Sequence, residues 1–166
     1  MLLHAPRLGA PSSLRNLTEL TRRIAAEVRA GRHPVEVDTT QRWYRRLRID
    51  DRLDDYLDVW LIGWATDQNT QLHDHAGSLG ALTVVSGGLT EHRWAPFTRR
   101  LRTRTLPAGR SVSFAPGHVH DVVNHAPAPA VSVHAYSPPL TAMSYYAVEP
   151  AGLRRTGTVL TEVTPG

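Results

Sequence analysis

The sequence predicts a mainly β domain with a single α-helix near its N-terminus, and three observations support this. Residues 13–30 carry apolar side chains at three- and four-residue spacing, which is the pattern of one amphipathic helix. From about residue 43 to residue 150, short β-rich segments follow one another at roughly ten-residue intervals. Glycine and proline lie between these segments, as is typical of turns. Together these patterns favour a sandwich or a barrel over alternating βαβ units.

The predicted helix has clear signals at both ends. Ser12 or Ser13 can cap its start, and Gly31 can end it after about Ala30. Its apolar stripe consists of Leu17, Leu20, Ile24 and Val28. We expect this stripe to pack against a sheet.

The strands are expected downstream of the helix. An aromatic and basic strip of alternating character comes first, at residues 43–48. Further strands are expected at residues 56–64, 81–85, 89–94, 99–105, 111–114, 119–123, 130–136 and 143–148. Gly87 and Gly88 indicate a tight hairpin turn, and the polar tail after Pro150 is either an edge strand or loosely ordered. A chain of 166 residues suits one domain spanning residues 1–166.

Composition narrows the possible classes of function. The absence of cysteine excludes disulfides, cysteine-ligated zinc, iron–sulfur clusters and a cysteine nucleophile. The chain has no lysine, and its 19 arginines are interleaved with acidic residues without a nucleic-acid-binding motif. We therefore expect no nucleic-acid partner despite the net charge of +4. Because no apolar run is long enough to span a membrane and no secretory signal is evident, we expect no membrane partner and a cytoplasmic location.

Two histidine stretches stand out as a candidate metal site. If a strand carries residues 72–75, His73 and His75 point to the same face, because strand side chains alternate. His120, in the stretch Gly-His-Val-His, can supply a third ligand from a later strand. Neutral imidazole offers a lone pair to a metal at neutral pH, so this trio predicts a metal centre.

The spacing around these histidines resembles the two sequence motifs of the cupins. In the first motif, His73 and His75 match the histidines, Gly87 matches the closing glycine, and Gly80 stands where most cupins carry a glutamate ligand. In the second motif the matching residues are Gly109, Gly117, His120 and Asn124. The resemblance implies a cupin jelly-roll β-barrel over about residues 43–150, preceded by the helix. Without the glutamate, the metal would have three neutral ligands. A divalent metal would then keep its full charge and have open coordination positions.

Residues 43–146 further resemble the cysteine dioxygenase family, and its bacterial members in particular. The marks are the His-Asp-His of residues 73–75, Gly80, the Gly117 to Asn124 stretch and the Ser-Val-His-Ala-Tyr-Ser-Pro-Pro of residues 132–139. Family members are non-haem iron(II) enzymes that add both atoms of O2 to a thiol sulfur to give a sulfinate. The resemblance implies that His73, His75 and His120 hold Fe(2+). Gly80 forbids the cysteine–tyrosine cross-link of animal relatives.

Ser132, His134 and Tyr136 are a second group of candidate functional residues. On a strand these three residues share one face, so Ser132 can fix the ring of His134, which can orient the Tyr136 hydroxyl. The resemblance places this tyrosine beside the iron. The alternative is a buried polar ladder that serves only strand packing.

The expected substrate, L-cysteine, has a carboxylate that needs a cationic partner. The planar guanidinium group of an arginine can bind a carboxylate through two hydrogen bonds. The family carries this arginine in a Tyr-x-Arg-x-Leu segment. Alignment on Leu47 selects Arg45, which we favour, whereas alignment on Tyr44 selects Arg46. An arginine at this position favours L-cysteine over 3-mercaptopropionate by resemblance.

The expected function is therefore a cysteine dioxygenase that uses a small thiol and O2 and acts as a monomer or small homo-oligomer. Two alternatives are a dioxygenase of 3-mercaptopropionate or another small thiol acid, and a non-catalytic metal-binding sensor. Among the other histidines, we expect His118 to be structural or at the rim, and His92 and His125 to lie at the surface or just outside the site. Trp60 and Trp64 are expected in the core.

Overall fold

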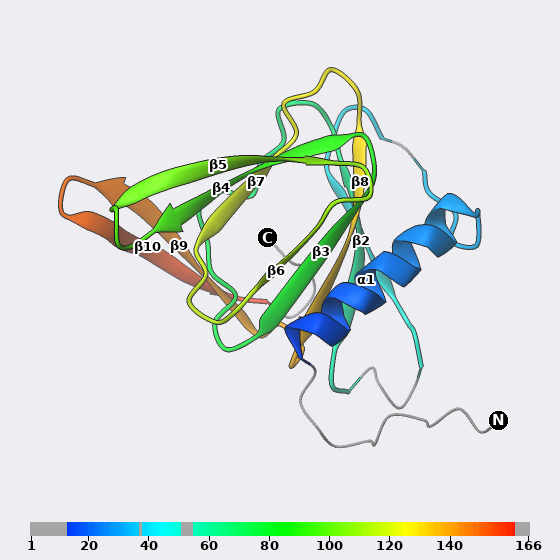
Figure 1. Ribbon diagram of the computed structural model, residues 1–166, viewed down its shortest axis with the longest axis horizontal. Helices are drawn as coiled ribbons and strands as arrows, with labels where there is room; N and C mark the ends of the chain where they lie inside the picture. The colour runs from blue at the N-terminus through cyan, green and yellow to red at the C-terminus, as the bar shows by residue number, and fades with distance from the viewer. Residues whose placement is uncertain (1–12, 37, 51–54, 162–166) are drawn as a thin grey trace.

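The computed structural model describes residues 13–36, 38–50 and 55–161, which form one helix and ten strands (Figure 1). In chain order the elements are α1 (Leu14–Arg29), β1 (Trp43–Leu47), β2 (Asp58–Trp64), β3 (Leu79–Ser86), β4 (Gly88–Ala95), β5 (Arg100–Pro107), β6 (Ser111–Phe114), β7 (His120–Val123), β8 (Ala130–Ser137), β9 (Ala142–Glu149) and β10 (Gly152–Leu160). The mainly β class with one N-terminal helix is confirmed. Within the tail after Pro150, residues Gly152–Leu160 form an edge strand, β10, which was one of the two predicted states, and residues 162–166 lie outside the described residues.

The helix begins as its sequence predicts. Ser13 caps α1, because its Oγ accepts a hydrogen bond from the backbone N–H of Asn16 at 3.1 Å, while Ser12 lies outside the described residues. Three residues of the apolar stripe, Leu17, Ile24 and Val28, are buried, and Leu20 is partly buried against the same cluster. In the part of the chain that the structure describes, no helix is long and apolar enough to cross a membrane.

The strands form two facing layers. Five strands make one antiparallel sheet in the order β1-β2-β8-β3-β6, and three make a second in the order β5-β4-β7. The hairpin β9–β10 extends the second layer through an extended segment, residues 69–75, since isolated bridges join His73 to both His120 and Tyr145 (Figure 1). The histidine pair thus lies in a bridging segment rather than in a regular strand.

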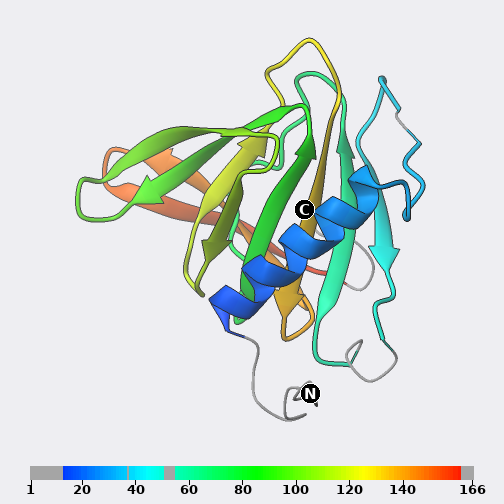
Figure 2. The ribbon, with the colours of Figure 1, turned by 45° about the vertical axis from the view of Figure 1, so that its right-hand side comes forward.

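Two hydrophobic clusters hold these layers together. One fills the space between the sheets, and the other lies between the five-stranded sheet and α1, which crosses its outer face (Figure 2). β8 is buried along its whole length because it contributes to both clusters. Val131, Val133 and Ala135 pack toward the helix, so alternation turns Ser132, His134 and Tyr136 toward the barrel interior.

Candidate metal centre

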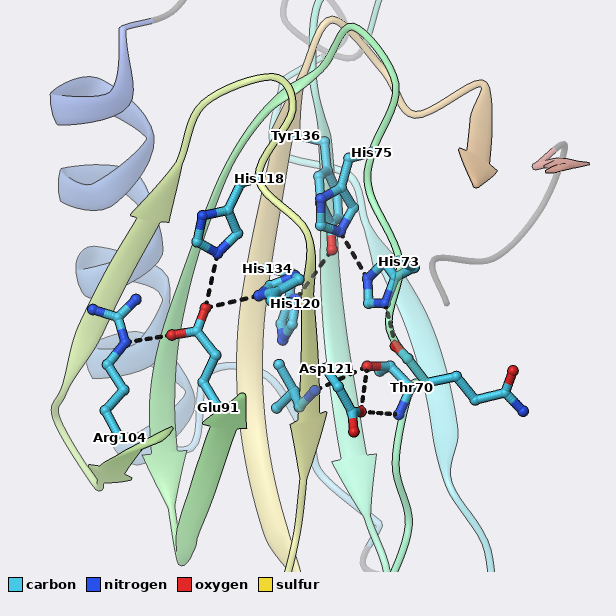
Figure 3. A network of polar contacts seen from close by, with 12 residues as sticks. Thr70, His73, His75, Glu91, Arg104, His118, His120, Asp121, His134 and Tyr136 are labelled. Atoms are coloured by element: carbon cyan, nitrogen blue, oxygen red, sulfur yellow. Dashed lines mark hydrogen bonds and ion pairs between the residues drawn. The ribbon is translucent and has the colours of Figure 1, made fainter. Parts of the chain in front are cut away.

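Three histidines from two segments converge inside the barrel. His73 and His75 come from the bridging segment and His120 begins β7 (Figure 3). The backbones of His73 and His120 exchange hydrogen bonds at 2.9 and 3.0 Å, which fixes their relative position. The Nε2 atoms of His73 and His75 lie 3.1 Å apart, and one nitrogen from each of the three rings lies within 4.8 Å of the others. All three side chains are buried.

The protonation of these rings suits metal binding. His73 Nδ1 lies 2.8 Å from the carbonyl oxygen of Gln71, which can only accept, so Nδ1 carries the hydrogen and Nε2 keeps its lone pair. Burial, reinforced by the neighbouring imidazoles, lowers the pKa of His73 and His75 well below the usual value, so both are neutral. Burial also lowers the pKa of His120. Three neutral imidazoles with convergent lone pairs fit a divalent transition metal.

Phe114 fills the space beside Gly80, the position at which the cupin motif carries a glutamate. A Cβ atom placed on Gly80 would lie 1.8 Å from Cε2 of Phe114. The Phe114 ring is stacked against His75, with centroids 4.8 Å apart and planes 23° from parallel. Position 80 therefore has no room for a glutamate or a cysteine unless Phe114 moves, which keeps that side of the centre apolar.

A hydrogen-bonded chain leads from the core to the histidines. Trp64 Nε1 donates to Ser132 Oγ at 2.8 Å, and Ser132 Oγ lies 2.9 Å from His134 Nε2. His134 Nδ1 lies 3.1 Å from the Tyr136 hydroxyl, a contact that Figure 3 shows. The Tyr136 ring centroid is 5.0 Å from that of His75. Burial raises the pKa of Tyr136, so the phenol stays protonated. The chain ends in a phenol hydroxyl beside the candidate metal ligands.

The burial of His134 makes the stability of the metal-free protein pH-dependent. Burial, together with the charges of His120 and Arg42, lowers the pKa of His134 from 6.5 to about 3. Below pH 6.5 His134 binds a proton in the unfolded chain but stays neutral in the folded chain. The free energy of unfolding therefore decreases as the pH falls. Replacing His134 with glutamine should remove about 2 kcal/mol of the stability change between pH 6.5 and pH 5. Urea unfolding of both metal-free proteins at the two pH values measures it, and equal pH dependence would contradict the prediction.

Glu91, which the sequence reasoning missed, is the acidic partner of the centre. It lies in β4 with its side chain fully buried. Glu91 Oε1 accepts from His120 Nδ1 at 2.8 Å and lies 3.1 Å from His118 Nε2, while Oε2 accepts from Arg104 Nε (Figure 3). His118 therefore has a structural contact near the centre, as expected. The sequence did contain a signal for Glu91. It lies two positions from buried Leu89 in an alternating strand, so its charged side chain is on the inward face.

His92 and His125 lie apart from the three ligands, near the surface. Their ring centroids are 6.1 Å apart, and His92 Nδ1 lies 2.8 Å from Thr103 Oγ1. Trp60 and Trp64 are buried, as expected. Trp60 Nε1 is the one buried side-chain polar atom among the described residues without a hydrogen-bond partner, which leaves a donor for a bound ligand.

The arginines of the strip divide between two faces of β1. Trp43 and Leu47 pack in the cluster beneath α1, whereas Tyr44 packs against the interior cluster. The Arg45 guanidinium lies 5.7 Å from the centroid of Trp43, and its Nη1 donates to the Pro34 carbonyl at 2.5 Å. The structure thus turns Arg45, the favoured substrate arginine, away from the histidines.

Two other arginines lie on the face of Tyr44. The Arg42 guanidinium is 5.2 Å from the centroid of Tyr44 and 5.5 Å from that of Trp64, and its Nη1 donates to the Asn69 carbonyl at 2.7 Å. Its charge contributes to the lowered pKa of His73, after burial and His120. Arg46 pairs with Asp58 at 2.6 Å and is 48% exposed. Arg42, which the sequence reasoning did not select, is therefore an inward-facing cation.

An antiparallel two-layer barrel with three convergent histidines defines a cupin. The chain belongs to the cysteine dioxygenase type I family, because the model of that family matches residues 31–148. A comparison with curated proteins finds no match.

Solved structures agree with this class of fold. A protein with a double-stranded β-helix domain from Klebsiella pneumoniae is 19% identical, with a TM-score of 0.51 over 78% of this chain and 91% of that one. A cupin superfamily protein from Desulfitobacterium hafniense is 9% identical, with a TM-score of 0.50 over 62% and 83%. A recombinant oxalate oxidase in complex with glycolate is 15% identical, with a TM-score of 0.54 over 68% and 62%. At these identities the likeness shows the fold alone.

Proposed function

We propose that this protein is a non-haem iron(II) thiol dioxygenase that converts L-cysteine and O2 to cysteine sulfinate. The observation that carries the proposal is the meeting of three neutral imidazoles beside Tyr136, in a ligand group that contains only histidines among the described residues. Membership of the cysteine dioxygenase type I family supports the reaction class. The cytoplasm, where small thiols stay reduced, is the proposed location.

Fe(2+) held by His73, His75 and His120 would stabilise the thiolate form of the substrate and activate O2. The protein's own part is to hold these three rings neutral and correctly oriented. Phe114 and the buried surroundings exclude water from one side of the centre. Both oxygen atoms end on sulfur, which becomes a sulfinate.

The serine–histidine–tyrosine chain is proposed to set the direction of one hydrogen bond. Since Trp64 already donates to Ser132, the Ser132 hydroxyl hydrogen is available to His134 Nε2. His134 would then donate from Nδ1 to the oxygen of Tyr136. In this arrangement the Tyr136 hydrogen points away from the chain and toward the substrate, where it can stabilise developing negative charge on oxygen.

We propose that the inward face of β1 binds the substrate carboxylate. Tyr44 and Arg46 share that face, and this supports the Tyr-x-Arg alignment over the one that selects Arg45. Arg42 adds a second cation on this face, where its guanidinium lies over Tyr44 and Trp64 and donates to the Asn69 carbonyl. We therefore assign the main anchoring role to Arg42, with Arg46 and Tyr44 assisting. The unpartnered Nε1 of Trp60 is a further donor for this anion.

Three single replacements by glutamine test this assignment. Arg42→Gln should raise the KM for L-cysteine by about 10-fold or more, because a charge-assisted hydrogen bond contributes about 1.5–3 kcal/mol. Arg46→Gln should have a smaller effect, and Arg45→Gln is the matched control with an unchanged KM. Steady-state kinetics with equal iron loading measure all three. A rise in KM confined to Arg45→Gln would reverse the assignment.

The function itself is tested by O2 consumption of protein loaded anaerobically with Fe(2+). L-cysteine and 3-mercaptopropionate are supplied separately and the sulfinate is quantified. Faster turnover of L-cysteine, with one sulfinate formed per O2, is expected. Preference for 3-mercaptopropionate would retain the iron chemistry and change the substrate to an amine-free thiol acid. No O2 uptake by iron-loaded protein with either thiol would overturn the dioxygenase proposal and favour a metal-binding sensor.

A further inference from the structure

A buried carboxylate lies one imidazole away from the metal centre. Glu91 Oε1 accepts a hydrogen bond from His120 Nδ1 at 2.8 Å, and this leaves Nε2 of the same ring as the nitrogen available to a metal. The two strands that carry these residues are paired, with Glu91 opposite Val122 and Arg93 opposite His120. Backbone pairing therefore holds the carboxylate beside the ring independently of any metal.

The surroundings of Glu91 keep it charged. Its side chain is fully buried, and its two oxygens accept hydrogen bonds from His118, His120 and Arg104, which favour the ionised form of the carboxyl group. Burying a carboxylate is costly unless such partners are present. Glu91 is therefore a fully buried carboxylate that three hydrogen-bond donors stabilise, and not a solvated surface charge.

Arg104 neutralises only part of the negative charge that Glu91 presents to His120. Arg104 contacts the other oxygen, Oε2, and its side chain is 35% exposed, so solvent screens its charge. Oε1 is directed at the two histidines. A carboxylate that accepts from the Nδ1–H of an imidazole raises the basicity of its Nε2 and fixes the orientation of the ring.

We propose that Glu91 is a positioning residue that supplies through His120 the negative charge which a direct carboxylate ligand would otherwise bring, and so strengthens the binding of a divalent cation. Gly80 and Phe114 exclude a carboxylate from the usual ligand position, whereas Glu91 reaches the centre from β4. The inference rests on the three-histidine metal centre of the proposed function, but on neither its substrate nor its reaction.

Cobalt(II) binding by the full chain tests the proposal without any turnover. The dissociation constant is measured by competition with a chromophoric chelator for the wild-type protein, Glu91→Gln and Glu149→Gln. Glu91→Gln should bind Co2+ about 10- to 100-fold more weakly, which is the usual effect of losing such an outer partner. Its visible Co2+ absorption should also shift, because His120 becomes a weaker donor. Glu149→Gln removes an exposed carboxylate that pairs with Arg154, and should bind as the wild type does.

A double variant separates charge from folding. Glu91→Gln leaves Arg104 without its carboxylate, so Glu91→Gln/Arg104→Gln removes both charges, and thermal unfolding of each metal-free variant reports whether it folds. Equally weak Co2+ binding by the folded double variant supports the proposal. Wild-type affinity in the double variant, or in folded Glu91→Gln, overturns it. Absence of Co2+ binding by the wild-type protein would instead overturn the metal centre of the proposed function.

Discussion

Replacing His120 with alanine is expected to abolish both iron binding and O2 consumption. The substitution removes one of the three candidate ligands and leaves two histidines that share one short segment, which is too few for a stable site. It also leaves the Glu91 carboxylate without one of its three donors. We expect the affinity for Fe(2+) to fall by well over 100-fold. Loss of a residue that only hydrogen-bonds to a metal ligand already lowers metal affinity by about 10- to 100-fold.

Iron content after anaerobic loading and gel filtration gives the first readout, and sulfinate formation gives the second. His92→Ala is the matched control, because His92 contacts Thr103 away from the centre. It should keep wild-type iron content and turnover. Activity retained by His120→Ala would refute the ligand assignment.

Replacing Tyr136 with phenylalanine is expected to lower kcat by about 100-fold or more while iron binding persists, in the range typical of a lost proton donor. The phenyl ring preserves the packing against His75 and in the interior cluster. Only the hydroxyl at the end of the Ser132–His134 chain is lost. The substitution therefore separates a catalytic role from a packing role.

The measurement is kcat and the ratio of sulfinate formed to O2 consumed, at equal iron loading. Tyr146→Phe is the control, because the Tyr146 hydroxyl bonds to Asp74 and is not part of the relay. An unchanged kcat in Tyr136→Phe would mean that the three residues form a polar ladder for packing alone. A ratio that falls well below one would show that Tyr136 directs oxygen onto sulfur.

Much of the site could be predicted from local sequence because it depends on strand periodicity. Alternation places Ser132, His134 and Tyr136 on one face of a strand wherever that strand lies in the fold. The spacing of His73, His75 and His120 relative to glycines at turns likewise predicted a metal site. The shared face of Ser132, His134 and Tyr136 follows from a short stretch of chain. The meeting of His120 with His73 was instead expected from the resemblance to the cupin motifs, because it depends on a bridge between distant segments.

The arginine and the acidic partner depended on tertiary structure. Alternation separates Tyr44 and Arg46 from Arg45, but it does not tell which face is inward. The packing of Trp43 beneath α1 determines that face. Glu91 and His120 are 29 positions apart, and only the pairing of β4 with β7 brings them together.

The sequence by itself therefore predicted the class of fold and the shared face of Ser132, His134 and Tyr136, because period-two alternation and turn residues act over a few neighbours. The resemblance to the cupin motifs supplied the three candidate ligands. Tertiary structure decided which arginines face the barrel interior. It also decided that Phe114 fills the space beside Gly80 and that the buried Glu91 carboxylate contacts His120. These features depend on the burial of one segment against another, and burial is a property of the packed sheets rather than of any single strand.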